Sequence, residues 1–272
     1  MCEETNVENL SAERWDKAAG DFQAVFRLGQ NEYNEGLFRF WEEEGLLRPG
    51  DRVLDLGCGV GKYGVLFARA GYRVSLADLS PEMLRLAREN MAGAETPWDA
   101  FVCDFHSATG AEAGFAGGFD FAISTMSPAV CDADTVKKLS AMIRRCCFLS
   151  RFSLWEQPLR DAVLAGAGIA PREKNAALAA DCEELLAAVR AAGYAPRTRT
   201  VDYDWCDRRS PEALADMLLR REIEGADEAL RPALEREARR YAQADGLVPD
   251  AVHTRVLWLW WRTGEQWLVA SS

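Results

Sequence analysis

Short apolar runs alternate with helically spaced apolar residues through the first half of the chain. Runs typical of strands cover residues 52–56, 73–77, 101–103, 119–124 and 147–154. Between them, residues 62–70, 80–90 and 134–144 have the spacing of amphipathic helices. Strands that alternate with helices pair in parallel through right-handed crossovers. The pattern therefore predicts a doubly wound α/β sheet.

The segments on either side of this alternation have a different pattern. Residues 16–26 and 32–47 are predicted helices, which Pro49-Gly50 ends. Towards the C-terminus, residues 181–192 are a predicted helix with Asp181 and Glu184 at capping-box spacing. Strands are expected at 197–205 and 252–262, on either side of helical residues 210–225 and 227–244. We therefore expect a helical cap over residues 1–50 and a main domain over 51–272, with a helical insertion at 210–244.

The charge balance narrows the class of partner. The chain has 32 lysines and arginines against 43 aspartates and glutamates, a net charge of −11. A protein that binds duplex nucleic acid or an anionic membrane needs a basic face, so neither is expected as a partner. No apolar stretch approaches the roughly 20 residues of a membrane helix, and residues 1–10 lack the pattern of a signal peptide. We expect a cytoplasmic monomer or homodimer.

The cysteines and histidines are scattered along the chain. None of the eight cysteines forms a C-x-x-C pair, and there are only two histidines, His106 and His253. This pattern predicts free thiols and no metal site. Cys146 and Cys147 lie at the start of a predicted buried strand and are expected to pack in the core.

The most informative segment follows the first predicted strand. Gly57, Gly59 and Gly61 form a G-x-G-x-G pattern, and Asp55 stands two residues before the first glycine. Nicotinamide-binding proteins use G-x-G-x-x-G, in which the pyrophosphate lies at a helix N-terminus. In this chain the third glycine comes one residue earlier. Glycines let the backbone pass close beneath a ligand, and Asp55 can accept hydrogen bonds from a cationic amine. The motif therefore favours a nucleoside that carries an amino acid.

With the segments that follow, this motif resembles that of the class I S-adenosylmethionine-dependent methyltransferases of the small-molecule type. Asp78 ends the second strand, and Ser80-Pro81-Glu82-Met83 opens the next helix as it does in that family. The resemblance implies a Rossmann-like, seven-stranded, mostly parallel sheet with an antiparallel last strand. It also implies S-adenosylmethionine as the cofactor and S-adenosylhomocysteine as the product.

The resemblance assigns roles to individual residues. Asp78 would hold the ribose hydroxyls, and Asp104 would contact the adenine amine with Phe105 packed on the ring. Ser124 ends a strand similar to the family's fourth motif, and Trp15 lies in a segment similar to its aromatic cap helix. The implied cofactor-binding residues are Trp15, Asp55, Gly57, Cys58, Gly59, Gly61, Asp78, Leu79, Met83, Asp104, Phe105 and Ser124.

One departure from the family bears on the methyl acceptor. Many N-methylating members carry N/D-P-P-Y/F after the fourth strand, whereas this chain has Thr125-Met126-Ser127-Pro128-Ala129. No carboxamide or carboxylate stands there to hold a target amine, which argues against methylation of adenine or glutamine. Met126, Ser127 and Pro128 are candidate substrate-binding residues because ligands bind beyond the carboxyl ends of parallel strands. No residue is identified as a catalytic base.

We therefore expect methyl transfer from S-adenosylmethionine to a small-molecule acceptor. Leu214, Met217, Leu218 and Ile223 form an apolar helix face in the insertion. We expect this face and the N-terminal cap to close over the acceptor as a lid. Three alternatives stay open: a protein that binds S-adenosylmethionine without turning it over, a methyltransferase with a thiol or metalloid acceptor, and a dinucleotide-dependent oxidoreductase.

Overall fold

The computed structural model describes residues 11–27, 32–107, 118–223 and 227–265, which divide into two compact units. Unit 1 contains the described residues up to Arg151, residues 183–199 and those from Trp258 onwards. Unit 2 contains residues 152–182 and the described residues between 200 and 257. The predicted cap at 1–50 falls inside unit 1, and the predicted insertion at 210–244 falls inside unit 2.

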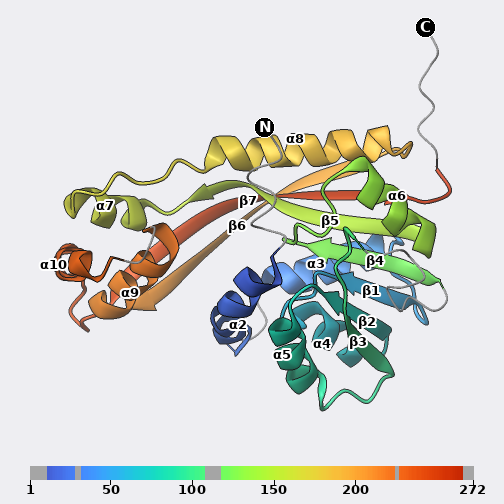
Figure 1. The fold of residues 1–272 in the computed structure, drawn as a ribbon, viewed down its shortest axis with the longest axis horizontal. Helices are drawn as coiled ribbons and strands as arrows, with labels where there is room; N and C mark the ends of the chain where they lie inside the picture. The colour runs from blue at the N-terminus through green and yellow to red at the C-terminus, as the bar shows by residue number, and fades with distance from the viewer. Residues whose placement is uncertain (1–10, 28–31, 108–117, 224–226, 266–272) are drawn as a thin grey trace, which may run out of the picture. The chain divides into compact units, whose positions relative to one another are not determined.

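A single seven-stranded sheet has the strand order β3-β2-β1-β4-β5-β7-β6 (Figure 1). Its strands are β1 (Arg52–Leu56), β2 (Arg73–Asp78), β3 (Trp98–Val102), β4 (Phe119–Thr125), β5 (Ile143–Glu156), β6 (Arg197–Arg209) and β7 (Val248–Arg262). Strands β1 to β5 pair in parallel, with Val53 opposite Val74 on one side and Phe121 on the other. The predicted doubly wound sheet is confirmed.

The last strands run antiparallel. Thr263 donates to the Arg145 carbonyl, and Ser153 lies opposite Arg255, so residue numbers rise along β5 as they fall along β7. Between β7 and β6, the Thr254 hydroxyl donates to the Tyr203 carbonyl in the same opposed sense. This arrangement confirms the mixed sheet that the resemblance implied.

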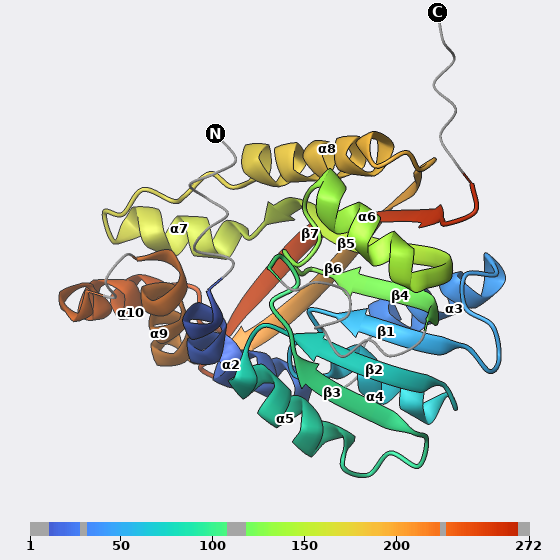
Figure 2. The ribbon, with the colours of Figure 1, turned by 45° about the vertical axis from the view of Figure 1, so that its right-hand side comes forward.

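Unit 1 also contains the helices α2 (Ala12–Arg27), α3 (Glu32–Glu43), α4 (Lys62–Arg69), α5 (Pro81–Met91) and α6 (Ala133–Met142) (Figure 2). Helix α2 packs against α5, and the others pack on the sheet. Helix α5 begins as the sequence predicts, with the Ser80 hydroxyl accepting from the Met83 N–H at 3.0 Å and Pro81 in the first helical position. The main core contains Leu54, Ala122 and Cys147, and Cys146 is also fully buried.

Unit 2 has a separate core. Helices α7 (Pro158–Gly166), α9 (Pro211–Glu222) and α10 (Arg231–Arg239) bury Val163, Leu164, Leu214, Leu218 and Leu234 together. The apolar face of α9 is therefore covered inside unit 2 by α7 and α10. The sequence argument that this face needs a cleft to cover loses its support, and the lid stays a prediction.

Three elements differ from the sequence expectation. Helix α7 was not predicted, and α8 (Asn175–Ala191) begins six residues earlier than expected. Asp181 and Glu184 lie inside α8, so the predicted capping box there is wrong. Strand β3 also begins earlier, at Trp98. It is the outermost strand of the sheet, and only part of its surface is buried, so its apolar signal is weak.

Candidate functional site

The glycine loop after β1 touches a second loop at Gly57 and borders open space at Gly59. Gly57, Gly59 and Gly61 all have positive φ, at 71°, 53° and 79°. A Cβ added at Gly57 would lie 1.8 Å from the Ser127 hydroxyl oxygen, so this glycine lets two loops touch. A Cβ added at Gly59 would have only the Met83 sulfur nearby, at 3.9 Å. The backbone at Gly59 therefore borders open space, where a ligand can lie against it.

Asp55 is buried beneath this loop. Its side chain is 1% exposed and accepts a hydrogen bond from the Gly64 N–H. Within the described part of the chain, its Oδ2 has no hydrogen-bond partner. Burial and then the negative charge of Asp78 raise the pKa of Asp55 to about 8. A buried carboxylate oxygen without a donor is a site that a cationic ligand group would satisfy.

Asp78, at the end of β2, joins two loops. Its Oδ2 accepts from the Gly59 N–H at 2.8 Å and its Oδ1 from the Ser80 N–H at 2.9 Å. Burial raises the pKa of Asp78 although these hydrogen bonds oppose the shift. Each carboxylate oxygen has two lone pairs, so Asp78 can hold the loop in shape and still accept from a ligand hydroxyl.

Helix α2 docks beside the same loop. The Asp16 carboxylate accepts from the Ser80 hydroxyl and, at 3.1 Å, from the Glu82 N–H at the start of α5. Trp15 packs against a small cluster that includes Val60 and Met83. The structure therefore brings predicted Trp15 and Met83 together with the glycine loop.

The carboxyl end of β4 contributes the third part of the site. Ser124 is fully buried, and within the described residues its hydroxyl has no hydrogen-bond partner. Met126 has φ of 52°, a conformation that costs an L-residue about 1–2 kcal/mol and that clusters at functional sites. Its N–H donates to the Ser150 carbonyl at 3.0 Å. The predicted substrate residues 126–128 thus adjoin the glycine loop through the close approach of Ser127 to Gly57.

Two predicted adenine contacts have other local roles. Asp104 is exposed and accepts from the Ser107 hydroxyl at 2.6 Å and the His106 N–H at 3.1 Å, which closes a turn. Partial burial alone would raise the pKa of Asp104, but these hydrogen bonds outweigh that effect, and the pKa is lowered. Phe105 is 2% exposed and belongs to the main core of unit 1. Contact of either residue with adenine stays a prediction.

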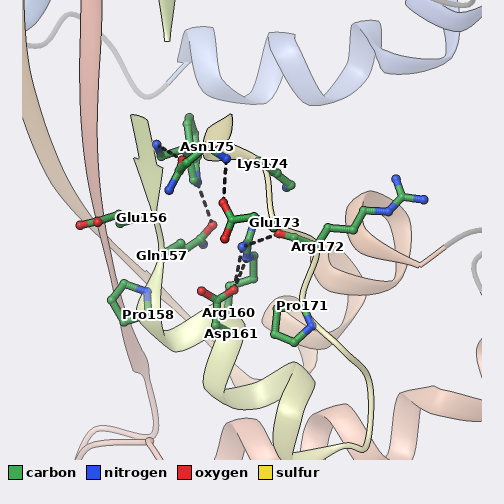
Figure 3. Close-up of a pocket in the computed structure, with 11 residues that line it drawn as sticks. Glu156, Gln157, Pro158, Arg160, Asp161, Pro171, Arg172, Glu173, Lys174 and Asn175 are labelled. Carbon is green, nitrogen blue, oxygen red and sulfur yellow. Dashed lines mark hydrogen bonds and ion pairs between the residues drawn. The ribbon is translucent and has the colours of Figure 1, made fainter. Parts of the chain in front are cut away.

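Unit 2 contains a polar pocket of about 580 Å³ that sequence reasoning missed (Figure 3). Its walls include Trp155, Arg160, Arg172 and Lys174. Arg160 is buried, and its Nε and Nη2 contact the Asp161 carboxylate at 2.8 and 2.6 Å. These residues come from the end of β5, from α7 and from the loop before α8, so no local sequence motif indicates the pocket.

One guanidinium nitrogen in this pocket has no hydrogen bond. Arg160 Nη1 is buried without a hydrogen-bond partner among the described residues, and the nearest carboxylate oxygen, on Glu222, is 3.8 Å away. Glu222 instead accepts from Lys174 at 2.7 Å. The pocket therefore offers a buried cationic donor. By contrast, Arg208 and Arg209 on β6 are paired with Asp245 and Asp207.

The described helices contain none that is long and apolar enough to cross a membrane. Among the described residues no cysteine forms a disulfide; the cysteines there are Cys58, Cys103, Cys131, Cys146, Cys147, Cys182 and Cys206.

Comparisons with known proteins point to one kind of domain. Residues 53–147 match a family model described as a methyltransferase domain. The chain is 36% identical over 81 residues to a malonyl-[acyl-carrier protein] O-methyltransferase of Serratia marcescens, an alignment that covers 30% of each protein. It is 50% identical over 40 residues to a ubiquinone biosynthesis O-methyltransferase of Xanthomonas campestris pv. campestris, which covers 15% of this chain and 17% of that one.

These matches are partial. The chain spans less than a third of the length of either curated relative. Among solved structures it is similar to phosphoethanolamine N-methyltransferase 2 of Haemonchus contortus, with a TM-score of 0.49 and 16% identity over 90% of this chain and 57% of that one.

Proposed function

We propose that the chain is a class I, S-adenosylmethionine-dependent methyltransferase, whose residues 53–147 match the methyltransferase domain, and that it methylates a small-molecule acceptor. The cofactor would lie at the carboxyl ends of β1 and β2. Two places, each within one unit, are candidates for the acceptor: Met126, Ser127 and Pro128 in unit 1, and the polar pocket of unit 2. That pocket suits an acceptor with an acidic group, because Arg160 Nη1 is a buried donor without a hydrogen-bond partner in the described part of the chain.

One observation carries the proposal: among the described residues, the Oδ2 of Asp55 has no hydrogen-bond partner. It lies beneath a glycine loop whose backbone at Gly59 borders open space. S-adenosylmethionine has a cationic amine that can donate to Asp55 and a ribose diol that can donate to Asp78. A dinucleotide would instead present a pyrophosphate, which has no hydrogen-bond donor to offer the Asp55 oxygen. These donor and acceptor types favour S-adenosylmethionine over a nicotinamide cofactor.

The chain's own contribution to the reaction is positioning. The cofactor supplies an activated methyl group on a sulfonium. Asp55 would hold the amine of the methionine part and Asp78 the ribose, and the strained turn at Met126 shapes the wall beside the glycine loop. Holding the acceptor atom in line with the methyl carbon and excluding water lowers the barrier without a charged catalytic group. We assign no catalytic base.

Binding by Gly59→Val and by a matched variant tests the cofactor assignment. Gly59→Val puts side-chain atoms into the open space, so titration calorimetry should show loss of S-adenosylmethionine binding. Gly45→Val is the control, since Gly45 has a similar φ of 64° and open surroundings. Gly45→Val should bind S-adenosylmethionine normally. It introduces similar backbone strain away from the open space at Gly59, so it separates strain from loss of that space. Equal binding by Gly59→Val and the wild type would overturn the assignment, and stabilisation by NAD in its place would favour the oxidoreductase.

Turnover separates an enzyme from a protein that only binds the cofactor. We expect the wild-type chain to release S-adenosylhomocysteine with a member of a panel of small carboxylic acids, and Gly59→Val to release none. The same panel should include thiols and arsenite, which test the thiol and metalloid alternatives. Tight cofactor binding with no release for any acceptor would support the non-catalytic alternative.

A further inference from the structure

Three side chains with metal-ligating atoms meet where β3 and β4 end, outside the cofactor residues. His106 follows β3, and Cys131 and Asp132 directly precede α6. A ring nitrogen of His106, the Cys131 sulfur and a carboxylate oxygen of Asp132 all lie within 4.8 Å of one another. His106 and Cys131 are half-buried, and Asp132 is exposed. The two segments are 25 residues apart in sequence, so only the fold reveals the cluster.

The surroundings hold two of these side chains in place. His106 Nε2 lies 3.3 Å from the Pro128 carbonyl oxygen. A carbonyl only accepts, so in the neutral ring Nε2 is the donor and Nδ1 has the lone pair. Histidines that bind metals usually donate their other N–H to such an acceptor. Asp132 Oδ1 accepts from the Thr135 N–H and hydroxyl, both at 2.8 Å, which fixes the carboxylate and leaves lone pairs on Oδ2.

The donor set selects a class of cation. One sulfur, one nitrogen and one oxygen suit a borderline-soft divalent ion such as Zn²⁺, whereas Ca²⁺ and Mg²⁺ prefer oxygen alone. A thiolate, a neutral imidazole and a carboxylate together carry two negative charges, which balance a divalent ion. Three protein ligands also leave a fourth tetrahedral position vacant.

We propose that His106, Cys131 and Asp132 bind one zinc-class divalent cation, whose remaining position is open to water or a ligand atom. On binding, the Cys131 thiol loses its proton to solvent as the sulfur–metal bond forms. The site is argued from this cluster alone and does not rest on the proposed methyl transfer. It revises the sequence expectation of no metal site, which assumed that scattered ligands stay apart.

Metal binding to the full chain tests this site without any assay of activity. The chelator-treated protein would be titrated with Zn²⁺ against a chromophoric competitor, and separately with Co²⁺ as an optical probe. We expect one equivalent of Zn²⁺ to bind, with a thiolate-to-cobalt charge-transfer band in the Co²⁺ form. Cys131→Ser should abolish that band, and Cys131→Ser, His106→Gln and Asp132→Asn should each weaken Zn²⁺ binding by at least about tenfold.

Matched variants keep the test decisive. Cys206→Ser removes an exposed cysteine outside the cluster and should change neither stoichiometry nor the band. Asp132→Asn preserves the helix cap, because asparagine caps as well as aspartate, so it reports on binding even if another variant unfolds. The proposal is overturned if the wild type binds no Zn²⁺, if Asp132→Asn binds as tightly as the wild type, or if Cys206→Ser removes the band.

Discussion

Asp55 makes the stability of the free protein depend on pH. Its pKa is raised from 3.8 to about 8, chiefly by burial. Between those values the folded state keeps a proton that the unfolded chain has released, so stability falls as pH rises. We expect the wild type to lose more free energy of unfolding between pH 5 and pH 8 than Asp55→Asn does. Urea denaturation at both pH values measures the difference, and parallel curves for the two proteins would contradict the assignment.

Asp55 should also release its proton when a cation binds. At pH 7 the free carboxyl is mostly protonated, and an adjacent cationic amine favours the ionised form. Binding of S-adenosylmethionine should therefore release up to about one proton in the wild type and none from this site in Asp55→Asn. Calorimetry in buffers of different ionisation enthalpy counts the protons. The same count for both proteins would show that the amine does not meet Asp55.

Substitution at Gly57 should lower stability, whereas substitution at Gly59 should lower cofactor binding. Gly57→Ala drives a methyl group into Ser127, so we expect a loss of about 1–3 kcal/mol in stability. Ser127→Gly removes both atoms in conflict and should recover most of that loss. Gly45→Ala, with a similar φ and no close neighbour, controls for backbone strain. Thermal unfolding of the wild type, Gly57→Ala, the Gly57→Ala/Ser127→Gly double variant and Gly45→Ala tests the contact between Gly57 and Ser127. A double variant no more stable than Gly57→Ala would refute that contact.

At the scale of elements, the docking of α2 depends on a few polar contacts. Asp16 accepts from the N-terminal turn of α5, where a carboxylate is also stabilised by the helix dipole. Asp16→Ala should cost about 1 kcal/mol and speed hydrogen exchange across α2. Lys17→Ala, which alters only an exposed pair with Glu13, should leave exchange unchanged. Unaltered exchange in Asp16→Ala would mean that Trp15 and the apolar cluster hold α2 alone.

Elements were predictable where local signals are strong. The glycine spacing after β1 and the Ser80-Pro81 cap of α5 depend on backbone needs that the sequence states directly. The start of α8 was missed because Asp181 and Glu184 imitate a cap inside a longer helix. The pocket around Arg160 and the cluster at His106 depend on tertiary packing between segments distant in sequence. Hydrophobic periodicity and motif spacing contain no information about tertiary contacts between such distant segments.

At the scale of the whole molecule, the division into two units predicts that cofactor binding and acceptor binding can be altered separately. The residues proposed to bind the cofactor lie in unit 1, and the polar pocket proposed as one place for the acceptor lies in unit 2. Arg172 lines that pocket and is exposed, so its removal should leave the fold intact. Once an acceptor is known, Arg172→Ala should raise its KM several-fold and leave the Kd of S-adenosylmethionine unchanged.

Asp78→Ala should give the reverse result. Each charge-assisted hydrogen bond contributes about 1.5–3 kcal/mol, so loss of one should raise the cofactor Kd at least about tenfold. The acceptor KM, measured at saturating cofactor, should stay constant. Asp99→Ala, an exposed acid on β3, serves as the control in unit 1. If Arg172→Ala leaves the acceptor KM unchanged while Asp78→Ala behaves as expected, the acceptor is recognised elsewhere, and residues 126–128 become the first place to look.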